Sequence, residues 1–222
     1  MPAVGISTNF TTRPDFPPTI TPYSATESNQ RSGSLTFAVV DLGVNLINSS
    51  DLRVGPFIGY SHLNEELNAY GCTQVASNPN VCSAVSSTSL NITEDAGWSM
   101  GRLGLAGEIQ LWEGLKLSGN AAWLPFGSLG GTDTHWLRID VGGPTGLSGP
   151  IVQTGPAQGA QLQVLIKHNI SAVFDIGVGG QYMSVYSNGI SHFELAETGG
   201  TSQPTKFSTT RYGVFVRASV SF

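Results

Sequence analysis

The fold is decided by the last twelve residues of the chain, Arg211-Tyr212-Gly213-Val214-Phe215-Val216-Arg217-Ala218-Ser219-Val220-Ser221-Phe222. Every second residue from Tyr212 to Phe222 is apolar, whereas the positions between them are glycine, serine and arginine, with Phe215 as the one large exception. Successive side chains of a β-strand point to opposite faces, so this stretch predicts a strand with one apolar and one polar face.

The same alternation recurs along the chain and predicts an all-β protein, an antiparallel transmembrane β-barrel. The outer face of such a barrel meets lipid and its inner face meets water. The last strand, which ends on an aromatic residue, resembles the C-terminal strand by which bacterial outer-membrane barrels are recognised for assembly. The expected location is therefore the bacterial outer membrane. A secreted β-sandwich is the alternative, because its strands also alternate.

Composition and charge favour this fold and exclude other classes. Only 11% of the 222 residues are charged and 28 are glycine, yet no apolar run reaches the ~18 residues of a transmembrane helix. The net charge is −5 without a basic cluster, which argues against nucleic-acid binding. No cofactor is implied, and two cysteines alone cannot complete a zinc site. Cys72 and Cys82 lie in a polar stretch, where we expect a short disulfide within one extracellular loop.

Seven strands are predicted in a barrel domain of residues 33–222, after an irregular segment of residues 1–32. They span residues 35–47, 53–68, 98–111, 115–129, 160–167, 172–187 and 211–222. Long polar loops at about 69–95, 131–157 and 188–209 alternate with short turns, as in outer-membrane barrels. Single-chain barrels have an even strand number, and no signal peptide is visible, so we expect the chain to begin inside a loop with upstream strands missing.

Two further sets of residues follow from this arrangement. Aromatic girdles at the membrane surfaces are expected near the strand ends, from Tyr60, Trp98, Trp112, Trp123, Tyr182 and Tyr212. A solvated, ion-paired lumen is expected from the inward charges Asp41, Arg53, Arg102, Glu108, Lys116, Asp175 and Arg217, with a transport path as the alternative.

Three stretches carry a resemblance to a known family. They are Asp51 to Tyr60, the paired strands around Trp112-Glu113-Gly114, and Trp123 to His135. They resemble the omptins, outer-membrane aspartyl-type endoproteases in which an aromatic-rich strand rises out of the membrane and ends in an Asp-x-His motif. The resemblance covers the C-terminal seven of ten strands. It implies an omptin-like endopeptidase with membrane lipid, lipopolysaccharide and a peptide or protein substrate as partners.

The resemblance implies that Asp133 and His135 are catalytic. Two residues apart on a strand, their side chains share a face, so the carboxylate can accept a hydrogen bond from the imidazole and prepare it as a general base. The family's acidic pair on the opposite wall would lie on strands upstream of Met1. The family's acidic position that receives a basic substrate side chain is Gly131 here, which removes that reason for cleavage at Arg or Lys.

Alternatives without a catalytic function stay open at this point. Asp133 and His135 can be ordinary polar loop residues, and the chain can be a non-catalytic barrel such as a small pore, an adhesin or a structural protein. We expect His62, His168 and His192 to be surface residues, and Glu65-Glu66 and Glu94-Asp95 to be solvated loop charges.

Overall fold

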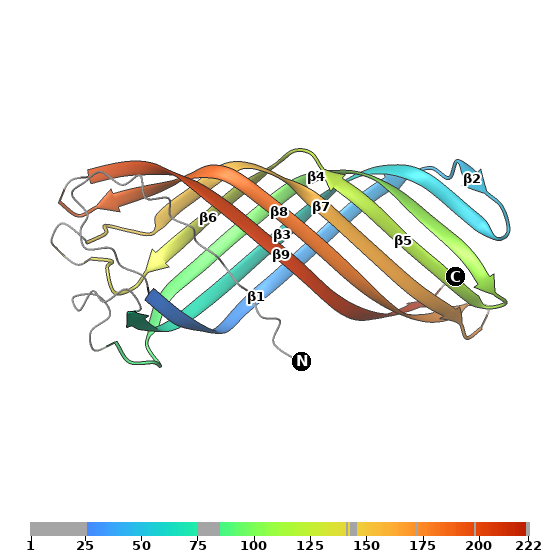
Figure 1. Ribbon diagram of the computed structural model, residues 1–222, viewed down its shortest axis with the longest axis horizontal. Helices are drawn as coiled ribbons and strands as arrows, with labels where there is room; N and C mark the ends of the chain where they lie inside the picture. Colours follow the sequence, from blue (N-terminus) through green and yellow to red (C-terminus); the bar gives the residue numbers. More distant parts are fainter. Residues whose placement is uncertain are drawn as a thin grey trace.

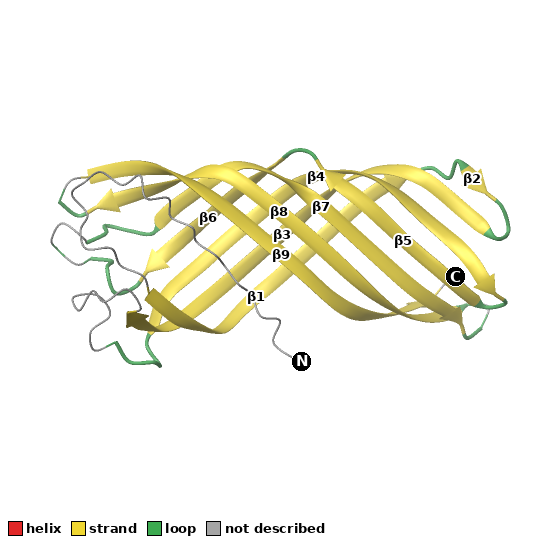
Figure 2. Cartoon of the chain, viewed as in Figure 1, coloured by secondary structure: helices red, strands yellow, loops and turns green. Residues whose placement is uncertain are grey.

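The computed structural model shows one curved antiparallel β-sheet (Figure 1). It describes residues 26–74, 85–140, 142, 146–171, 173–197 and 199–220. All the regular elements in these residues are strands (Figure 2), which confirms the predicted all-β fold. Among the described residues there is no helix that is long and apolar enough to span a membrane.

The described residues form nine strands, which occupy seven positions in the sheet. The strands are β1 (Thr26–Gly43), β2 (Ile47–Asn48), β3 (Leu52–Gln74), β4 (Leu90–Trp112), β5 (Leu115–Leu124), β6 (Gly127–His135), β7 (Ile151–Asn169), β8 (Phe174–Leu195) and β9 (Gly199–Val220). Their order is β1-β3-β4-β5-β7-β8-β9, and β6 continues the β5 position by pairing with β4 and β7. The seven predicted strands correspond to these seven positions, with the predicted strand 115–129 divided into β5 and β6, and the short β2 pairs with the start of β3.

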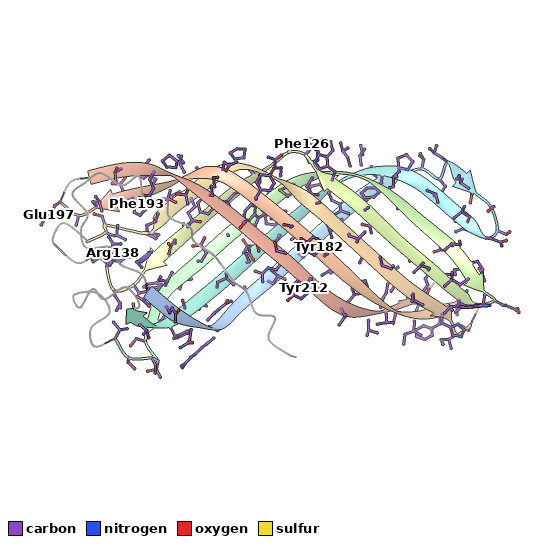
Figure 3. The ribbon with its side chains drawn as sticks, in the orientation of Figure 1. Phe126, Arg138, Tyr182, Phe193, Glu197 and Tyr212 are labelled. Atoms are coloured by element: carbon purple, nitrogen blue, oxygen red, sulfur yellow. The ribbon has the colours of Figure 1, made fainter. Side chains whose placement is uncertain are left out.

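The single predicted strand 115–129 is broken at Pro125 and Phe126. Proline has no N–H to donate to a sheet ladder, so regular pairing stops there. The backbone oxygen of Phe126 nevertheless accepts a 2.9 Å hydrogen bond from the N–H of Gly101, which keeps β6 beside β4. Figure 3 shows Phe126 projecting from this junction.

The two edges of the sheet are β1 and β9, and no described residue of one pairs with the other. All seven positions are antiparallel, so β1 and β9 run in the same direction. The sheet curls until side chains from its two halves meet. Glu65 of β3 contacts Arg211 of β9, 146 residues later, and also accepts a 3.2 Å hydrogen bond from the indole of Trp98.

The strands connect by tight turns at one end and by longer segments at the other (Figure 1). The turn end holds the connections after Asn48, Trp112 and Asn169. At the other end several strands extend further than predicted: β3 reaches Gln74, β6 reaches His135 and β8 reaches Leu195. The predicted loop boundaries were wrong because apolar alternation marks only the part of a strand whose outer face is apolar, whereas backbone pairing continues beyond it.

The outer face has an apolar half and a polar half. On β7, the exposed residues Leu162, Val164 and Ile166 lie toward the turn end, and Thr154 and Gln158 lie toward the loop end. The other long strands mostly repeat this division, although Val152 of β7 and Tyr186 and Ile190 of β8 are exposed in the loop-end half. On β9 the outward residues Tyr212, Val214, Val216 and Val220 lie toward the turn end, and Thr210 and Ser208 lie toward the loop end. An apolar band of this kind is the lipid-facing surface of a transmembrane barrel. We therefore treat the turn-end half as membrane-spanning.

Aromatic residues mark the border between the two halves. Tyr182 and Tyr212 are direct partners on β8 and β9 (Figure 3), and Tyr60 and Trp123 lie on the outer face at a similar level. Tyr60, Tyr182 and Tyr212 lie within long strands rather than at strand ends, whereas Trp123 is next to the last residue of β5 and the exposed Trp112 ends β4, as expected. Trp98 does not belong to the predicted girdle, because its side chain points inward and is 3% exposed.

The interior combines an apolar core with ion pairs. The core includes Phe57, Leu63, Trp98, Met100, Leu124, Leu129, Met183, Val185 and Phe207. Arg102 forms a two-pronged ion pair with Asp41, with its Nε 2.8 Å from Oδ1, and Glu108 binds Lys116 and Lys167. The predicted ion-paired interior is confirmed for Asp41, Arg102, Glu108 and Lys116, whereas Lys167 was not among the residues expected there.

Two boundaries at the loop end differ from the prediction. β1 begins at Thr26, so residues 26–32 are strand rather than the irregular segment expected there, and residues 1–25 lie outside the described part. Cys72 lies on β3 rather than in a loop, and it is disulfide-bonded. The other cysteine of the chain, Cys82, falls outside the described residues.

Candidate functional site

Asp133 and His135 form a contact near the end of β6. They occupy the same face of the strand, and Nε2 of His135 lies 3.0 Å from Oδ2 of Asp133. Both side chains are partly covered, at 24% exposed for His135 and 16% for Asp133. The predicted geometry, with the two side chains adjacent and within hydrogen-bond reach, is present. Because a carboxylate only accepts, the ring N–H at Nε2 donates to Asp133, which leaves Nδ1 as the basic nitrogen.

β4, β6 and β7 place the Asp133–His135 pair on the inner face of the sheet, on the loop-end side of the apolar band. β6 pairs with β4 on one side and β7 on the other, and its residue Leu129, on the same face as Asp133, packs in the interior core. The chain after His135 is also anchored. The N–H of Trp136 donates to the oxygen of Asn91, and Leu147, fully buried, bridges to Leu195 at the end of β8.

Gly131 marks a close approach between β6 and β4. A Cβ atom added at Gly131 would clash with the backbone oxygen of Asp95. Any side chain would therefore displace the β4 backbone. The position where the omptin resemblance has an acidic side chain is closed to one in this structure.

Glu94 is a third member of the site that the sequence analysis misplaced as a solvated loop charge. It lies on β4 directly opposite Asp133 of β6, and Nε2 of Gln153 donates a 3.2 Å hydrogen bond to its Oε2. Burial, then the charge of Asp133, raise the pKa of Glu94 from 4.5 to about 8 against the opposing hydrogen bond from Gln153. Glu94 is therefore mostly protonated at neutral pH.

Unsatisfied buried atoms and a nearby cation complete the picture. Oδ1 of Asp133 and Oε1 of Gln153 are buried acceptors without a hydrogen-bond partner among the described residues. Arg138, in the turn after β6 (Figure 3), has its pKa lowered by burial, and the charge of Asp133 opposes that effect. The site thus contains two carboxyl groups, an imidazole and a guanidinium in a partly water-excluded setting.

The other histidines provide a contrast. His192 also contacts a carboxylate, with Nε2 2.8 Å from Oε1 of Glu194, but this pair lies on the outer face and His192 is 40% exposed. His62 on β3 contacts the hydroxyl of Ser99 at 3.0 Å. Neither histidine faces the interior. Glu65, in contrast, is not a solvated loop charge as expected, because it is 4% exposed and bound to Arg211 and Trp98.

The interior of the membrane-spanning half contains a cavity lined in part by charged residues. A cavity of about 350 Å³ lies in the membrane-spanning half, and Arg53, Glu108, Lys167 and Arg217 are among its lining residues. Arg102 lies on the loop-end side of this cavity and is only 2% exposed. The guanidinium of Arg102 lies 5.4 Å from the centre of the Phe57 ring. The apolar core continues beyond this level. Arg102 and the core residues are buried at levels between the cavity and the Asp133–His135 pair.

Comparison with known proteins supports the fold rather than a family. No protein-family model and no curated protein sequence matches this chain. The fold is similar to that of the outer membrane protease OmpT from Escherichia coli, with a TM-score of 0.65 and 15% sequence identity. The similarity covers 88% of this chain and 66% of that chain, so this chain spans just under two thirds of the protease. At this identity the likeness is one of fold: an OmpT-like β-barrel architecture.

Proposed function

We propose that this chain is the larger part of an outer-membrane barrel of omptin type that hydrolyses peptide bonds at the cell surface. The observation that carries the proposal is the Asp133–His135 contact. It lies on the inner face of the sheet, on the loop-end side of the apolar band. The OmpT-like fold supports both the outer-membrane location and the choice of a hydrolytic reaction.

The chemistry follows from the direction of the hydrogen bond between the two residues. Asp133 accepts from Nε2–H of His135, so Nδ1 can take a proton from a water molecule. The oxygen of that water forms a bond to the carbonyl carbon of the peptide. The imidazolium then returns the proton to the leaving amine as the C–N bond breaks. Asp133 stabilises the imidazolium between these two steps, and no covalent intermediate with the protein forms.

The substrate would enter from the loop end, because the interior below the site is filled by the core and by Arg102. Gly131 offers no acidic side chain to a basic residue of the substrate. We therefore propose a peptide or protein substrate without assigning it a preference for Arg or Lys. Further groups facing His135 would come from strands beside β1 and β9, which are the edges of the sheet among the described residues.

The test is peptide cleavage by the protein expressed from its own gene in a bacterial host that lacks outer-membrane proteases. Intact cells are incubated with a mixture of quenched fluorescent peptides. Replacing His135 by alanine is expected to lower the cleavage rate by roughly 10²–10⁴-fold, the usual contribution of a general base.

His192→Ala is the matched control, since it removes a histidine–carboxylate contact from the outer face of the same barrel. We expect this variant to retain the rate of the unmodified protein. Equal rates in the His135→Ala and unmodified proteins would remove the catalytic role and leave a non-catalytic barrel as the function.

A further inference from the structure

We propose that Glu94 is a positioning residue of this site: as a neutral carboxylic acid, it donates a hydrogen bond to Oδ1 of Asp133 and fixes the carboxylate that holds His135. Glu94, Asp133 and His135 then form one hydrogen-bonded chain across β4 and β6. The catalytic consequence rests on the proposed function, but the hydrogen bond itself does not.

The sheet register brings the two carboxyl groups together. Glu94 and Asp133 are direct partners in the antiparallel β4–β6 pair, and the next inward partners along β4 and β6 are Ala96 and Gly131. Directly opposed residues have Cβ atoms about 4.5–5.5 Å apart and point to the same face. Gly131 is the inward neighbour of Asp133 on β6. It has no side chain that could separate the side chain of Glu94 from β6. The short side chain of Asp133 therefore lies within reach of the longer one of Glu94.

The unsatisfied oxygen of Asp133 indicates what Glu94 supplies. Oδ2 of Asp133 is taken by His135, whereas Oδ1 is buried without a donor in the described part of the chain. Oε2 of Glu94 is taken by Gln153, which leaves Oε1 for the remaining contact. A buried acceptor without a partner costs free energy, and two ionised carboxylates side by side cost more. A proton on Oε1 of Glu94 removes both costs, because it gives Oδ1 of Asp133 a donor.

The groups around Glu94 are consistent with a protonated carboxyl group at this position. From β3, Leu67 lies opposite Glu94, and Glu65 one step further is already bound to Arg211. From β7 the neutral Gln153 reaches Glu94, while Asp95 on β4 points to the other face and adds a smaller repulsion. Arg138 and His135 lie on the Asp133 side of the pair. Burial and Asp133 raise the pKa of Glu94 to about 8, consistent with this geometry.

The direct test is a carbon-13 NMR titration of the eight glutamates in the full protein, folded in detergent micelles. The Glu94 carboxyl signal is identified by its loss in Glu94→Gln. We expect its midpoint near pH 8 in the unmodified protein and at least about one pH unit lower in Asp133→Asn, because that change removes the charge that Glu94 faces. An unchanged midpoint in Asp133→Asn would overturn the proposal, since burial alone would then hold the proton.

Activity provides a second and separable test at pH 7. The amide of Glu94→Gln is neutral and can donate to Asp133, so its cleavage rate should stay within a few-fold of the unmodified protein. Glu94→Ala removes the donor, and its rate should fall roughly 10- to 100-fold, as expected for a misplaced catalytic group. Equal loss in both variants would contradict the role of a neutral donor.

The outcomes distinguish this inference from the proposed function. If Asp133→Asn moves the Glu94 midpoint while His135→Ala still cleaves peptides, the hydrogen-bonded chain exists and the catalytic proposal fails. If His135→Ala abolishes cleavage while the midpoint stays fixed in Asp133→Asn, the catalytic proposal stands and Glu94 has no positioning role.

Discussion

Replacing Asp41 by leucine is expected to lower the free energy of unfolding by about 3–5 kcal/mol, because it leaves Arg102 as a buried charge without its partner. Arg102 is 2% exposed and binds both carboxylate oxygens of Asp41, at 2.8 and 3.1 Å. Its other contacts with described residues include Gln161 and the ring of Phe57, neither of which carries a negative charge. Removing one partner of such a pair costs more than the pair itself contributes.

The double variant Asp41→Leu with Arg102→Met separates these two quantities. Replacing a buried ion pair by apolar residues of similar volume is often neutral or stabilising. We therefore expect the double variant to recover most of the loss seen in Asp41→Leu. Urea unfolding from lipid vesicles measures all three proteins. A loss below about 1 kcal/mol in Asp41→Leu would show that Arg102 is hydrated and that the interior at this level is wet.

The second large effect concerns Glu94 and pH. Its pKa rises from 4.5 to about 8 on folding, so between these values the folded protein holds a proton that the unfolded chain has lost. The contribution of Glu94 to the free energy of unfolding is therefore fully present below pH 4.5 and is lost as the pH rises toward 8. The loss amounts to as much as about 5 kcal/mol, at roughly 1.36 kcal/mol for each unit of pKa.

Glu94→Gln removes this dependence because glutamine does not ionise. We expect the difference in unfolding free energy between Glu94→Gln and the unmodified protein to shift in favour of the variant from about pH 5 to about pH 9. The other titrating groups are common to both proteins and cancel in that difference. Parallel stability curves across this range would mean that Glu94 ionises as freely in the folded protein as in the unfolded chain.

Alternation of apolar residues predicted the strands well where one face meets lipid. Val164, Val178 and Val216 point outward, and each lies in a predicted strand whose outer face is apolar. The strand ends were misplaced in the loop-end half, where Thr154, Ser208 and Thr210 face outward and no apolar period is left to detect. Backbone hydrogen bonding does not depend on that period, so pairing continues to Leu195 and from Gly199.

The candidate site shows the same limit. The Asp133–His135 contact could be predicted because two residues on one strand share a face at a spacing of two. The contribution of Glu94 could not, because it depends on the register between β4 and β6, two strands joined through β5 and the break at Pro125. The predicted positions of Trp98 and Glu65 were wrong for a related reason. Glu65 contacts Trp98 and Arg211, which lie on other strands, so these contacts depend on the tertiary structure.

The position of the barrel in the membrane can be measured directly from tryptophan fluorescence in vesicles whose lipids carry bromine on the acyl chains. Trp123 lies on the outer face at the border of the apolar band, whereas Trp136 lies at the loop end beside His135. Brominated lipid should quench the unmodified protein and Trp136→Phe to a similar fraction, and it should quench Trp123→Phe clearly less. Loss of quenching in Trp136→Phe instead would place the Asp133–His135 pair inside the lipid and contradict a site at the cell surface.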